Sequence, residues 1–385
     1  MSTPVRALTL EQLRERTSEK WQEYPADVLP LFVAETDFPL APAITRTLER
    51  AVAAGDTGYV ASRTPLAAAY SEFARRRFGW TPDPVRMRST ADVSMGIVEI
   101  LRRVTAPGDR VIVMPPVYPP FYDLVEEAGA IVERVPLRDT GAAWEIDLDG
   151  IRAALETGAR AVLLCSPHNP TGTVHTAESL AAVADLAAAH GAAVISDEIH
   201  APLAQPESGF TPFLAVSDAA REVGYAVISA SKAFNLAGLK CALMVTASDG
   251  PTRVVRALPV EVEWRTGQFG LLAATAAFSE QSDDWLDGLL ATLDENRQLL
   301  AALLAEHVPG ARYRIPDAGY LAWVDLTDLG WGDNPARRIL REAKVALHYG
   351  PAFGAEGAGH VRLNFGTSPE ILTEAVARIA ALRDS

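Results

Sequence analysis

The sequence predicts an α/β fold with a mostly parallel, doubly wound sheet and a second, smaller α+β domain. Between residues 94 and 245, apolar strand-like runs alternate with helix-like runs, as successive βαβ units require. Beyond residue 250 the pattern changes to long helices and short strands. A chain of 385 residues is longer than one core usually serves. We therefore expect a large domain over 44–275 and a small domain over 1–43 and 276–385.

The elements of the large domain follow from apolar spacing. Apolar residues at helical spacing predict a helix at 94–104, and an alanine-rich amphipathic stretch predicts a covering helix at 176–190. A last strand at 241–245 is expected to be antiparallel to its neighbour. Buried strands of the parallel sheet are expected at 110–114, 131–135, 161–165, 193–197 and 225–229.

The smaller domain is expected to combine long helices with short strands. Helices are predicted at 268–281 and 284–307, and the second leads from the large domain into the small one. Two more are predicted near 334–342 and 369–383. Short strands are expected at 312–315, 320–325, 345–347 and 360–365.

Composition narrows the class of protein. The excess of 49 acidic over 35 basic residues gives a formal charge of −14, which argues against nucleic acid and anionic membranes as partners. No apolar stretch is long enough to span a bilayer, and residues 1–10 lack a signal-peptide core, so a cytoplasmic protein is expected. The two cysteines, Cys165 and Cys241, are expected to be buried, reduced thiols.

A lysine in a turn of small residues is the most informative feature of the chain. Residues 224–228 form an apolar run, so Lys232, in the following Ser-Ala-Ser-Lys, emerges at the carboxyl end of a strand, where open α/β sheets bind ligands. A lysine there can form a Schiff base with an aldehyde cofactor, and flanking hydroxyls can hold a phosphate. A solvated surface lysine is the alternative interpretation.

Two more polar residues follow strand-like runs. Asp197 ends the run 193–197, where its carboxylate can pair with a protonated pyridine nitrogen or cap the next helix. Asn169 follows the run 161–165 in an Asn-Pro-Thr-Gly turn, which either aims its amide at a ligand or only reverses the chain. Both residues therefore stand at strand tips, as Lys232 does.

The late strand-like run 361–365 contains one basic residue, Arg362, between apolar neighbours. Such an arginine can clamp a carboxylate with two hydrogen bonds, although a strand arginine that faces solvent is as common. His348, Tyr349 and Phe353, in a nearby loop, are expected either to form a pocket wall or simply to pack the loop.

Together and in this order, these segments resemble the aspartate-aminotransferase superfamily of pyridoxal-5′-phosphate enzymes, or fold type I, over nearly the whole chain. The resemblance implies that Lys232 is the Schiff-base lysine, that Asp197 partners the pyridine nitrogen, and that Asn169 donates to the phenolic oxygen of the ring. Arg362 then clamps the substrate α-carboxylate. Tyr118, in a Pro-Pro-Val-Tyr-Pro-Pro run, matches the aromatic residue that stacks on the ring, and we count it with Lys232 and Asp197 as catalytic.

The same resemblance places residues at the cofactor phosphate. Ser229 and Lys240 match positions that hold it, and Val93 and Ser94, at the start of the helix predicted at 94–104, are expected beside it. Tyr59 matches a tyrosine that reaches the phosphate of the neighbouring subunit. The active unit is therefore expected to be a homodimer.

Several short sequence motifs are similar to those of the MalY/PatB type of cystathionine β-lyases, which are C–S lyases acting on cysteine conjugates. Three departures stand out. The usual Ala-Asp-Met-Asp-Phe motif is Ala-Glu-Thr-Asp-Phe at residues 34–38, where Asp37 is expected to bind substrate. Asp92 replaces an expected glycine. Lys240 stands where the subgroup often has a neutral residue. Asp92 is an awkward charge near a phosphate unless its carboxylate points away or caps the following helix. The similar motifs lie at residues 33–39, 196–200, 231–239 and 320–323.

His200 matches a position that in aminotransferases is a tyrosine bonding the phenolic oxygen of the cofactor. A histidine can donate there too, and a helix-start histidine bonded to local backbone is the alternative. Zinc is not expected, because Glu198 and His200 lack the i, i+4 spacing of a helical pair and no third ligand is evident.

These residues predict a pyridoxal-phosphate C–S β-lyase that converts L-cystathionine or a related cysteine thioether to a thiol, pyruvate and ammonia. Lys232, displaced by the substrate amine, is expected to take the Cα proton as general base. An aminotransferase would use the same residues and is the alternative. A regulator that binds the cofactor without turnover is a third possibility. The partner in each case is a small amino acid.

Overall fold

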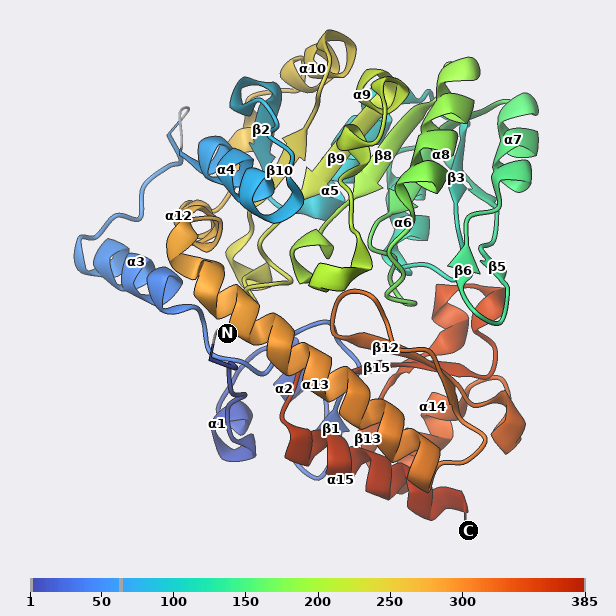
Figure 1. Ribbon diagram of the computed structural model, residues 1–385. Coiled ribbons are helices and arrows are strands. Elements are labelled where there is room, and N and C mark those ends of the chain that lie inside the picture. The colour runs from blue at the N-terminus through green and yellow to red at the C-terminus, as the bar shows by residue number, and fades with distance from the viewer. Residues whose placement is uncertain (1–2, 62–64, 384–385) are drawn as a thin grey trace.

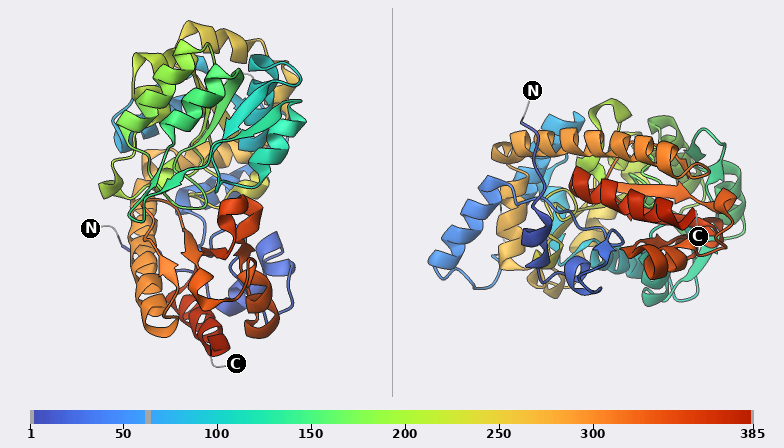
Figure 2. Two further views of the ribbon diagram at one scale, coloured as in Figure 1. Left: turned by 90° about the vertical axis from the view of Figure 1, so that its right-hand side faces the viewer. Right: turned by 90° about the horizontal axis from the view of Figure 1, so that it is seen from below.

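Figure 1 shows the computed structural model of the chain, which describes residues 3–61 and 65–383. A seven-stranded sheet lies in one part of the molecule and a four-stranded sheet in the other (Figures 1 and 2). The long helix α13 (Asp283–His307) runs from the first part along the second. Within the described residues, no helix is long and apolar enough to cross a membrane.

The seven-stranded sheet confirms the predicted α/β fold. Its strand order is β2-β10-β9-β8-β7-β3-β4, and every neighbouring pair from β9 to β4 is parallel. The predicted last strand, β10, is antiparallel to β9, as expected. The strands are β2 (Met87–Thr90), β3 (Arg110–Val113), β4 (Ile131–Arg134), β7 (Ala159–Cys165), β8 (Ala193–Asp197), β9 (Gly224–Ile228) and β10 (Ala242–Val245).

The edge strand β2 was not predicted. Its sequence, Met-Arg-Ser-Thr, has no apolar run, and three of its four residues are only half-buried. It pairs antiparallel with β10, so the pairing surface of the neighbouring strand defines it more than its own composition does.

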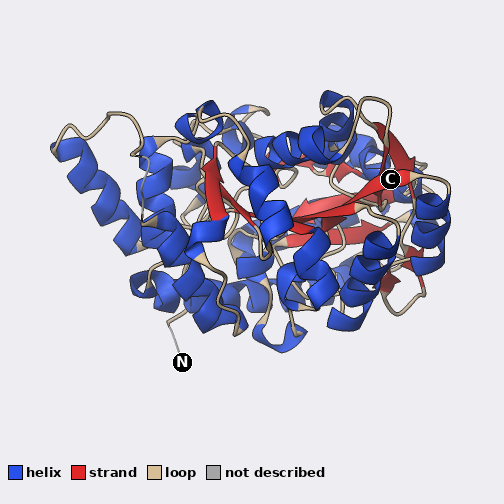
Figure 3. Cartoon of the chain, turned by 90° about the horizontal axis from the view of Figure 1, so that it is seen from above, coloured by secondary structure: helices blue, strands red, loops and turns tan. Residues whose placement is uncertain are grey.

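Helices cover both faces of this sheet, as Figure 3 shows. Side chains of β7 alternate between two apolar clusters because successive residues of a strand point to opposite faces. Val162 and Leu164 pack in the cluster that includes α7 (Leu148–Glu156) and α8 (Ala177–Ala189). Leu163 and Cys165 pack in the cluster that includes α5 (Val93–Val104) and α6 (Pro120–Glu127).

A glycine brings α5 close to the sheet. A Cβ atom at Gly96 would lie 2.8 Å from Cγ1 of Val227 in β9, a separation that real Cβ atoms do not show. This close approach places the amino end of α5 next to the carboxyl end of β9. The first residues of α5 and the turn that follows β9 therefore lie side by side.

The second part of the molecule contains an antiparallel sheet in the order β11-β12-β15-β14. The strand predicted at 345–347 is present as β13 (Val345–Ala346), but it pairs in parallel with β1 (Leu29–Pro30) of the amino-terminal segment and not with this sheet. The domain boundaries after residues 43 and 275 stay a prediction. The four strands are β11 (Arg312–Tyr313), β12 (Leu321–Asp325), β14 (His348–Tyr349) and β15 (His360–Asn364).

The other predicted helices are present, with shifted ends. The helix expected at 268–281 ends at Ala277 as α12 (Gln268–Ala277), and the helix expected near 334–342 is α14 (Pro335–Arg338) continued by a π-helical turn at Ile339–Ala343. The remaining elements are α1 (Leu10–Arg14), α2 (Glu19–Gln22), α3 (Pro42–Ala53), α4 (Leu66–Phe78), α9 (Asp218–Val223), α10 (Asp249–Arg256), α11 (Glu261–Trp264), α15 (Pro369–Ala380), β5 (Arg138–Asp139) and β6 (Trp144–Glu145).

Candidate active site

A cavity opens at the carboxyl ends of the parallel strands, where α/β sheets bind ligands. Its wall is built by the turns that follow β7, β8 and β9, together with the first residues of α5. Arg362, Asp37 and Tyr59 are not part of this wall. The predicted site residues that line it are Val93, Ser94, Tyr118, Asn169, Asp197, His200, Ser229, Lys232 and Lys240.

Lys232 reaches into the cavity from the turn after β9. Its Nζ donates a hydrogen bond to the backbone oxygen of Ala34 at 3.1 Å. Within the described part of the chain, no carboxylate lies at ion-pair distance from this ammonium group. Desolvation, with the positive charge of Arg362, lowers the pKa of Lys232 to about 8. The solvated surface lysine of the alternative interpretation is therefore not what the structure shows.

Asp197 ends β8 and is 5% exposed. Its Oδ1 accepts a hydrogen bond from the backbone nitrogen of Ile199 at 3.0 Å, and no cation lies at ion-pair distance in the described structure. Burial raises the pKa of Asp197 to about 7. The neighbouring Glu198 is turned elsewhere, since its Oε1 accepts from Ser196 Oγ and from the backbone nitrogen of Phe213.

Arg362 lies in β15, behind the cavity wall, and is 3% exposed. Its guanidinium donates to Asn169 Oδ1 and to the backbone oxygen of Phe32, each at 3.0 Å, and lies 3.2 Å from His348 Nδ1. Its Nε is buried without a partner, and the described residues place no carboxylate beside it. Burial lowers the pKa of Arg362 to about 10. A buried cation with only neutral partners is suited to an anionic ligand.

The bond from Arg362 also orients Asn169. A guanidinium can only donate, so the amide oxygen of Asn169 faces Arg362, and its amino group is the part free to bond a ligand oxygen. His348 is bound to Arg362 in the same way and accepts through Nδ1. Of the loop residues that were expected to line a pocket or pack the loop, His348 and Phe353 contact Arg362, with the guanidinium 5.0 Å from the Phe353 ring centre.

His200 is buried in the cavity wall, and its Nδ1 has no hydrogen-bond partner in the described structure. The bond to local backbone that was the alternative for this residue is therefore not made by Nδ1. Burial lowers the pKa of His200 to about 3, so the ring is neutral and can donate through one nitrogen. Tyr118 lines the same cavity, and burial raises the pKa of its phenol.

The far end of the cavity combines a helix start with a cation. Asp92 caps α5 through a hydrogen bond from the backbone nitrogen of Met95 to its Oδ1 at 2.9 Å, and its Oδ2 lies 3.1 Å from Nζ of Lys240. The carboxylate of Asp92 thus caps the helix and is paired with Lys240. Ser229 Oγ donates to the backbone oxygen of Cys241 at 2.7 Å, so its proton is committed within the turn. Ser231, which also lines the cavity, was not among the predicted site residues.

The model of the family described as aminotransferase class I and II matches residues 56–379 of the chain. The chain belongs to this family. A protein of Mycobacterium tuberculosis named "Putative cystathionine beta-lyase" is 47% identical over 98% of the chain and 97% of its own length. The cystathionine beta-lyase of Corynebacterium glutamicum is 35% identical over 97% and 98%.

A solved structure agrees over the whole chain. The crystal structure of a "putative plp-dependent beta-cystathionase" from Corynebacterium diphtheriae superposes with a TM-score of 0.94 at 34% identity, and the match covers 99% of both chains. These relatives confirm the fold type and the family resemblance that the sequence motifs indicated.

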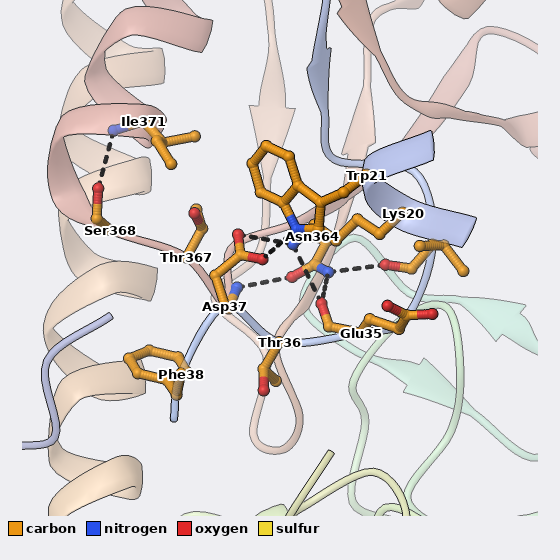
Figure 4. Close-up of polar contacts among 12 residues, drawn as sticks. Lys20, Trp21, Glu35, Thr36, Asp37, Phe38, Asn364, Thr367, Ser368 and Ile371 are labelled. Carbon is orange, nitrogen blue, oxygen red and sulfur yellow. Dashed lines mark hydrogen bonds and ion pairs between the residues drawn. The ribbon is translucent and has the colours of Figure 1, made fainter. Parts of the chain in front are cut away.

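One predicted site residue of this aminotransferase-family chain needs correction. Asp37 is fully buried away from the cavity, and both of its carboxylate oxygens are bonded within the protein, as Figure 4 shows. Lys20 Nζ lies 2.8 Å from Oδ2, and Trp21 Nε1 donates to Oδ1 at 3.0 Å. Asp37 therefore does not meet the expectation that it binds substrate, because its acceptors are already used.

Asp37 instead anchors a segment that reaches Lys232. We call residues 33–38 the strap; most of its backbone oxygens accept side-chain hydrogen bonds. Figure 4 shows those that Lys20 and Asn364 donate. The oxygen of Ala34 accepts from both Lys232 and Tyr320, and the Asn235 side chain exchanges two bonds with the backbone of Thr36. Asn235 and Tyr320 lie in the motifs at 231–239 and 320–323, but the sequence assigned them no role, and Lys20 lies in no motif, because the partners of all three are far away in the chain.

Tyr59 follows α3 and is 96% exposed. Within one chain it contributes nothing to the cavity. An aromatic side chain this exposed is suited to contact another molecule, and the expected role across a subunit interface stays a prediction.

Proposed function

We propose that this chain is a pyridoxal-5′-phosphate-dependent C–S β-lyase that cleaves L-cystathionine or a related cysteine thioether to a thiol, pyruvate and ammonia. The observation that carries the proposal is the 47% identity over 98% of the chain to the relative named "Putative cystathionine beta-lyase". The site supports the pyridoxal-phosphate chemistry that a lyase and an aminotransferase share, since the partly buried Lys232 and the buried Asp197 and Arg362 lie there without an ion pair among the described residues.

The residues present fit this cofactor. Lys232 offers a primary amine in a desolvated site, and Asp197 offers a buried carboxylate that lacks a cation. The start of α5 and Lys240 offer a place for a phosphate, and Tyr118 offers an aromatic face. When bound, pyridoxal phosphate supplies an electron sink for the carbanion that forms when the substrate loses its Cα proton.

Each residue then has a physical task. A lysine with a pKa near 8 is partly unprotonated at neutral pH, so Lys232 can take the Cα proton. A positively charged ring nitrogen beside Asp197 would give this carboxylate the missing partner and keep it ionised. Arg362 would bind the substrate carboxylate and fix the orientation of Cα.

The two outcomes open to this site differ in where Lys232 delivers the proton. In a β-lyase Lys232 would deliver the proton to the departing β-sulfur, so that a thiol leaves, and the remaining amino-acid fragment would take up water to give pyruvate and ammonia. In an aminotransferase Lys232 would deliver the proton to a carbon of the bound cofactor, and the next turnover would need a keto acid. We expect thiol, pyruvate and ammonia from L-cystathionine without added keto acid. Steady amino-group transfer to 2-oxoglutarate, with no thiol from any cysteine thioether, would instead make the chain an aminotransferase, and bound cofactor with no turnover would make it a regulator.

The proposed active unit is a cytoplasmic homodimer in which Tyr59 completes the site of the partner. The exposure of Tyr59 in the single chain supports this assembly. In mixed dimers of Lys232→Ala and Tyr59→Ala subunits, one site would regain both residues, so activity should exceed that of either parent. Purely additive activity, or a fully active monomer by light scattering, would count against the assembly.

A further inference from the structure

A carboxylate occupies the end of the cavity that best suits an anion. Asp92, Val93 and Ser94 line this end, where the twelve-residue helix α5 begins. The amino end of a helix attracts anions through its free N–H groups and its dipole. Asp92 already uses one of these groups, because the backbone nitrogen of Met95 donates to its Oδ1 at 2.9 Å. A phosphate bound here would therefore share the helix start with a negative charge.

Lys240 is the cation at this end of the cavity. Its Nζ lies 3.1 Å from Asp92 Oδ2. The other lysine of the wall, Lys232, is turned to the oxygen of Ala34. The charge of Lys240 is consequently balanced by Asp92 before any ligand arrives.

We propose that Asp92 weakens phosphate binding from within the site, and that Lys240 offsets this effect by neutralising Asp92. This inference rests on the proposed function, since the phosphate in question is that of pyridoxal phosphate. A phosphate and a carboxylate that share one lysine and one helix start repel each other. The side chains of Lys240 and Asp92 are 59% and 33% exposed, so salt should screen this repulsion. The arrangement makes the cofactor more readily exchangeable than a neutral cap would.

The variant that tests this is Asp92→Asn. Asparagine caps a helix as well as aspartate does, so the bond from Met95 is retained while the charge is removed. We expect the cofactor-free full-length variant to bind pyridoxal phosphate about tenfold more tightly than the wild type at low salt, measured by fluorescence titration. The difference should shrink in high salt. Pyridoxal, which lacks the phosphate, should bind the two proteins equally.

The matched control is Asp147→Asn. Asp147 caps α7 in the same way, through Gly150 N at 3.2 Å, and is not part of the cavity wall. This variant should leave the affinity for pyridoxal phosphate unchanged. Circular dichroism would confirm that both Asn variants fold.

Lys240→Met completes the test. It leaves Asp92 unpaired, so the affinity for pyridoxal phosphate should fall at least tenfold, and inorganic phosphate should compete less well with the cofactor. The double variant Asp92→Asn with Lys240→Met should bind more tightly than Lys240→Met alone. An affinity of Asp92→Asn within twofold of wild type, a weaker affinity, or an equal gain with pyridoxal would overturn the inference. Failure of the wild type to hold pyridoxal phosphate on Lys232 would instead contradict the proposed function.

Discussion

The fully buried Lys20 beside the strap and the partly buried Lys232 in the cavity both lie near an aspartate, and within the described structure only Lys20 forms an ion pair with it. Lys20 lies 2.8 Å from Asp37, and both side chains are fully buried. Trp21 and the oxygen of Glu35 complete the set of partners. Burial lowers the pKa of Lys20 even with Asp37 beside it. This region is chemically closed, because the carboxylate and the ammonium group already bond each other.

The cavity holds the same two residue types apart. Among the residues that the structure describes, the Lys232 ammonium bonds only a backbone oxygen, and the Asp197 carboxylate bonds only a backbone nitrogen. Burial moves the two pKa values toward each other, to about 8 and about 7. A buried charge without a partner costs stability, so a protein keeps one mainly where a ligand supplies the partner. We call Lys232 and Asp197 the open pair and Lys20 and Asp37 the closed pair. The comparison teaches that the open pair marks the ligand site and that the closed pair supports the fold around it.

The largest effect should come from Lys232→Ala, which removes the amine of the open pair. An alanine can neither bind the aldehyde cofactor nor move a proton, so turnover should be abolished. The wild-type protein should be yellow, and borohydride reduction followed by mass spectrometry should find the cofactor on Lys232. Cofactor trapped on Lys20, Lys240 or Lys344 would refute the assignment.

Lys20→Met should break the closed pair and lower the free energy of unfolding by about 3–5 kcal/mol, because it leaves Asp37 buried without its cation. Urea unfolding measures this change. Replacing both partners, as in Lys20→Met with Asp37→Leu, should recover much of the loss. Both variants should still hold the cofactor on Lys232. A Lys20→Met protein of wild-type stability would mean that the ion pair of Lys20 with Asp37 does not stabilise the fold.

Arg362→Met should lower kcat/KM by a factor that corresponds to a loss of about 2–5 kcal/mol in transition-state stabilisation, since the substrate carboxylate would lose its buried cation. Arg297 is the matched control, because this buried arginine already bonds two carboxylates, at 2.8 Å to Asp294 and 2.6 Å to Glu207. Arg297→Met should reduce stability and leave kcat/KM nearly unchanged.

A substrate whose carboxylate is replaced by an amide separates the two arginines further. It should react poorly with the wild type and lose little more with Arg362→Met, because the interaction is already absent. If Arg362→Met reduced kcat/KM by the same factor for the amide and the carboxylate substrates, this arginine would not bind the substrate carboxylate.

The sequence predicts the sheet well because its strands carry their own signal. Strands buried on both faces are continuous apolar runs, and each predicted strand from 110–114 to 241–245 lies within two residues of an observed one. The strand at 131–135 was expected to be buried, but β4 is an edge strand whose end residues are exposed. The edge strand β2 and the pairing of β13 with β1 were missed, since both depend on a distant partner. The cavity residues were found where they lie at the end of such a strand, as Asp197 does, or in the turn after it, as Lys232 and Asn169 do.

The strap could not be predicted from local patterns. Its residues 33–38 form no regular helix or strand, and the bonds that hold them come from Arg16, Lys20, Asn235, Tyr320 and Asn364. An acidic residue beside an expected substrate site suggested binding, whereas Asp37 is used for support. Only the three-dimensional structure distinguishes a carboxylate that is bonded from one that is free.

The smallest effect, Asp197→Asn, concerns stability against pH in the cofactor-free protein. Burial raises the pKa of Asp197 from 3.8 to about 7, so the folded state keeps a proton that the unfolded state has already lost. The charged form therefore costs stability increasingly as pH rises from about 4 to about 7. Asparagine cannot ionise, so its advantage over wild type should grow by roughly 2–4 kcal/mol across this window.

Urea midpoints at pH 5 and pH 8 measure that advantage as a difference between variant and wild type. Taking the difference matters because Glu198 and the buried histidines titrate in both proteins. Asp37→Asn is the control from the closed pair, and it should lose stability at both pH values since Lys20 loses its partner. Added pyridoxal phosphate should make the wild type more stable than Asp197→Asn, because the ring cation stabilises the carboxylate and not the amide. Wild-type and Asp197→Asn curves that run parallel from pH 5 to pH 8 would show that the folded protein does not raise the pKa of Asp197.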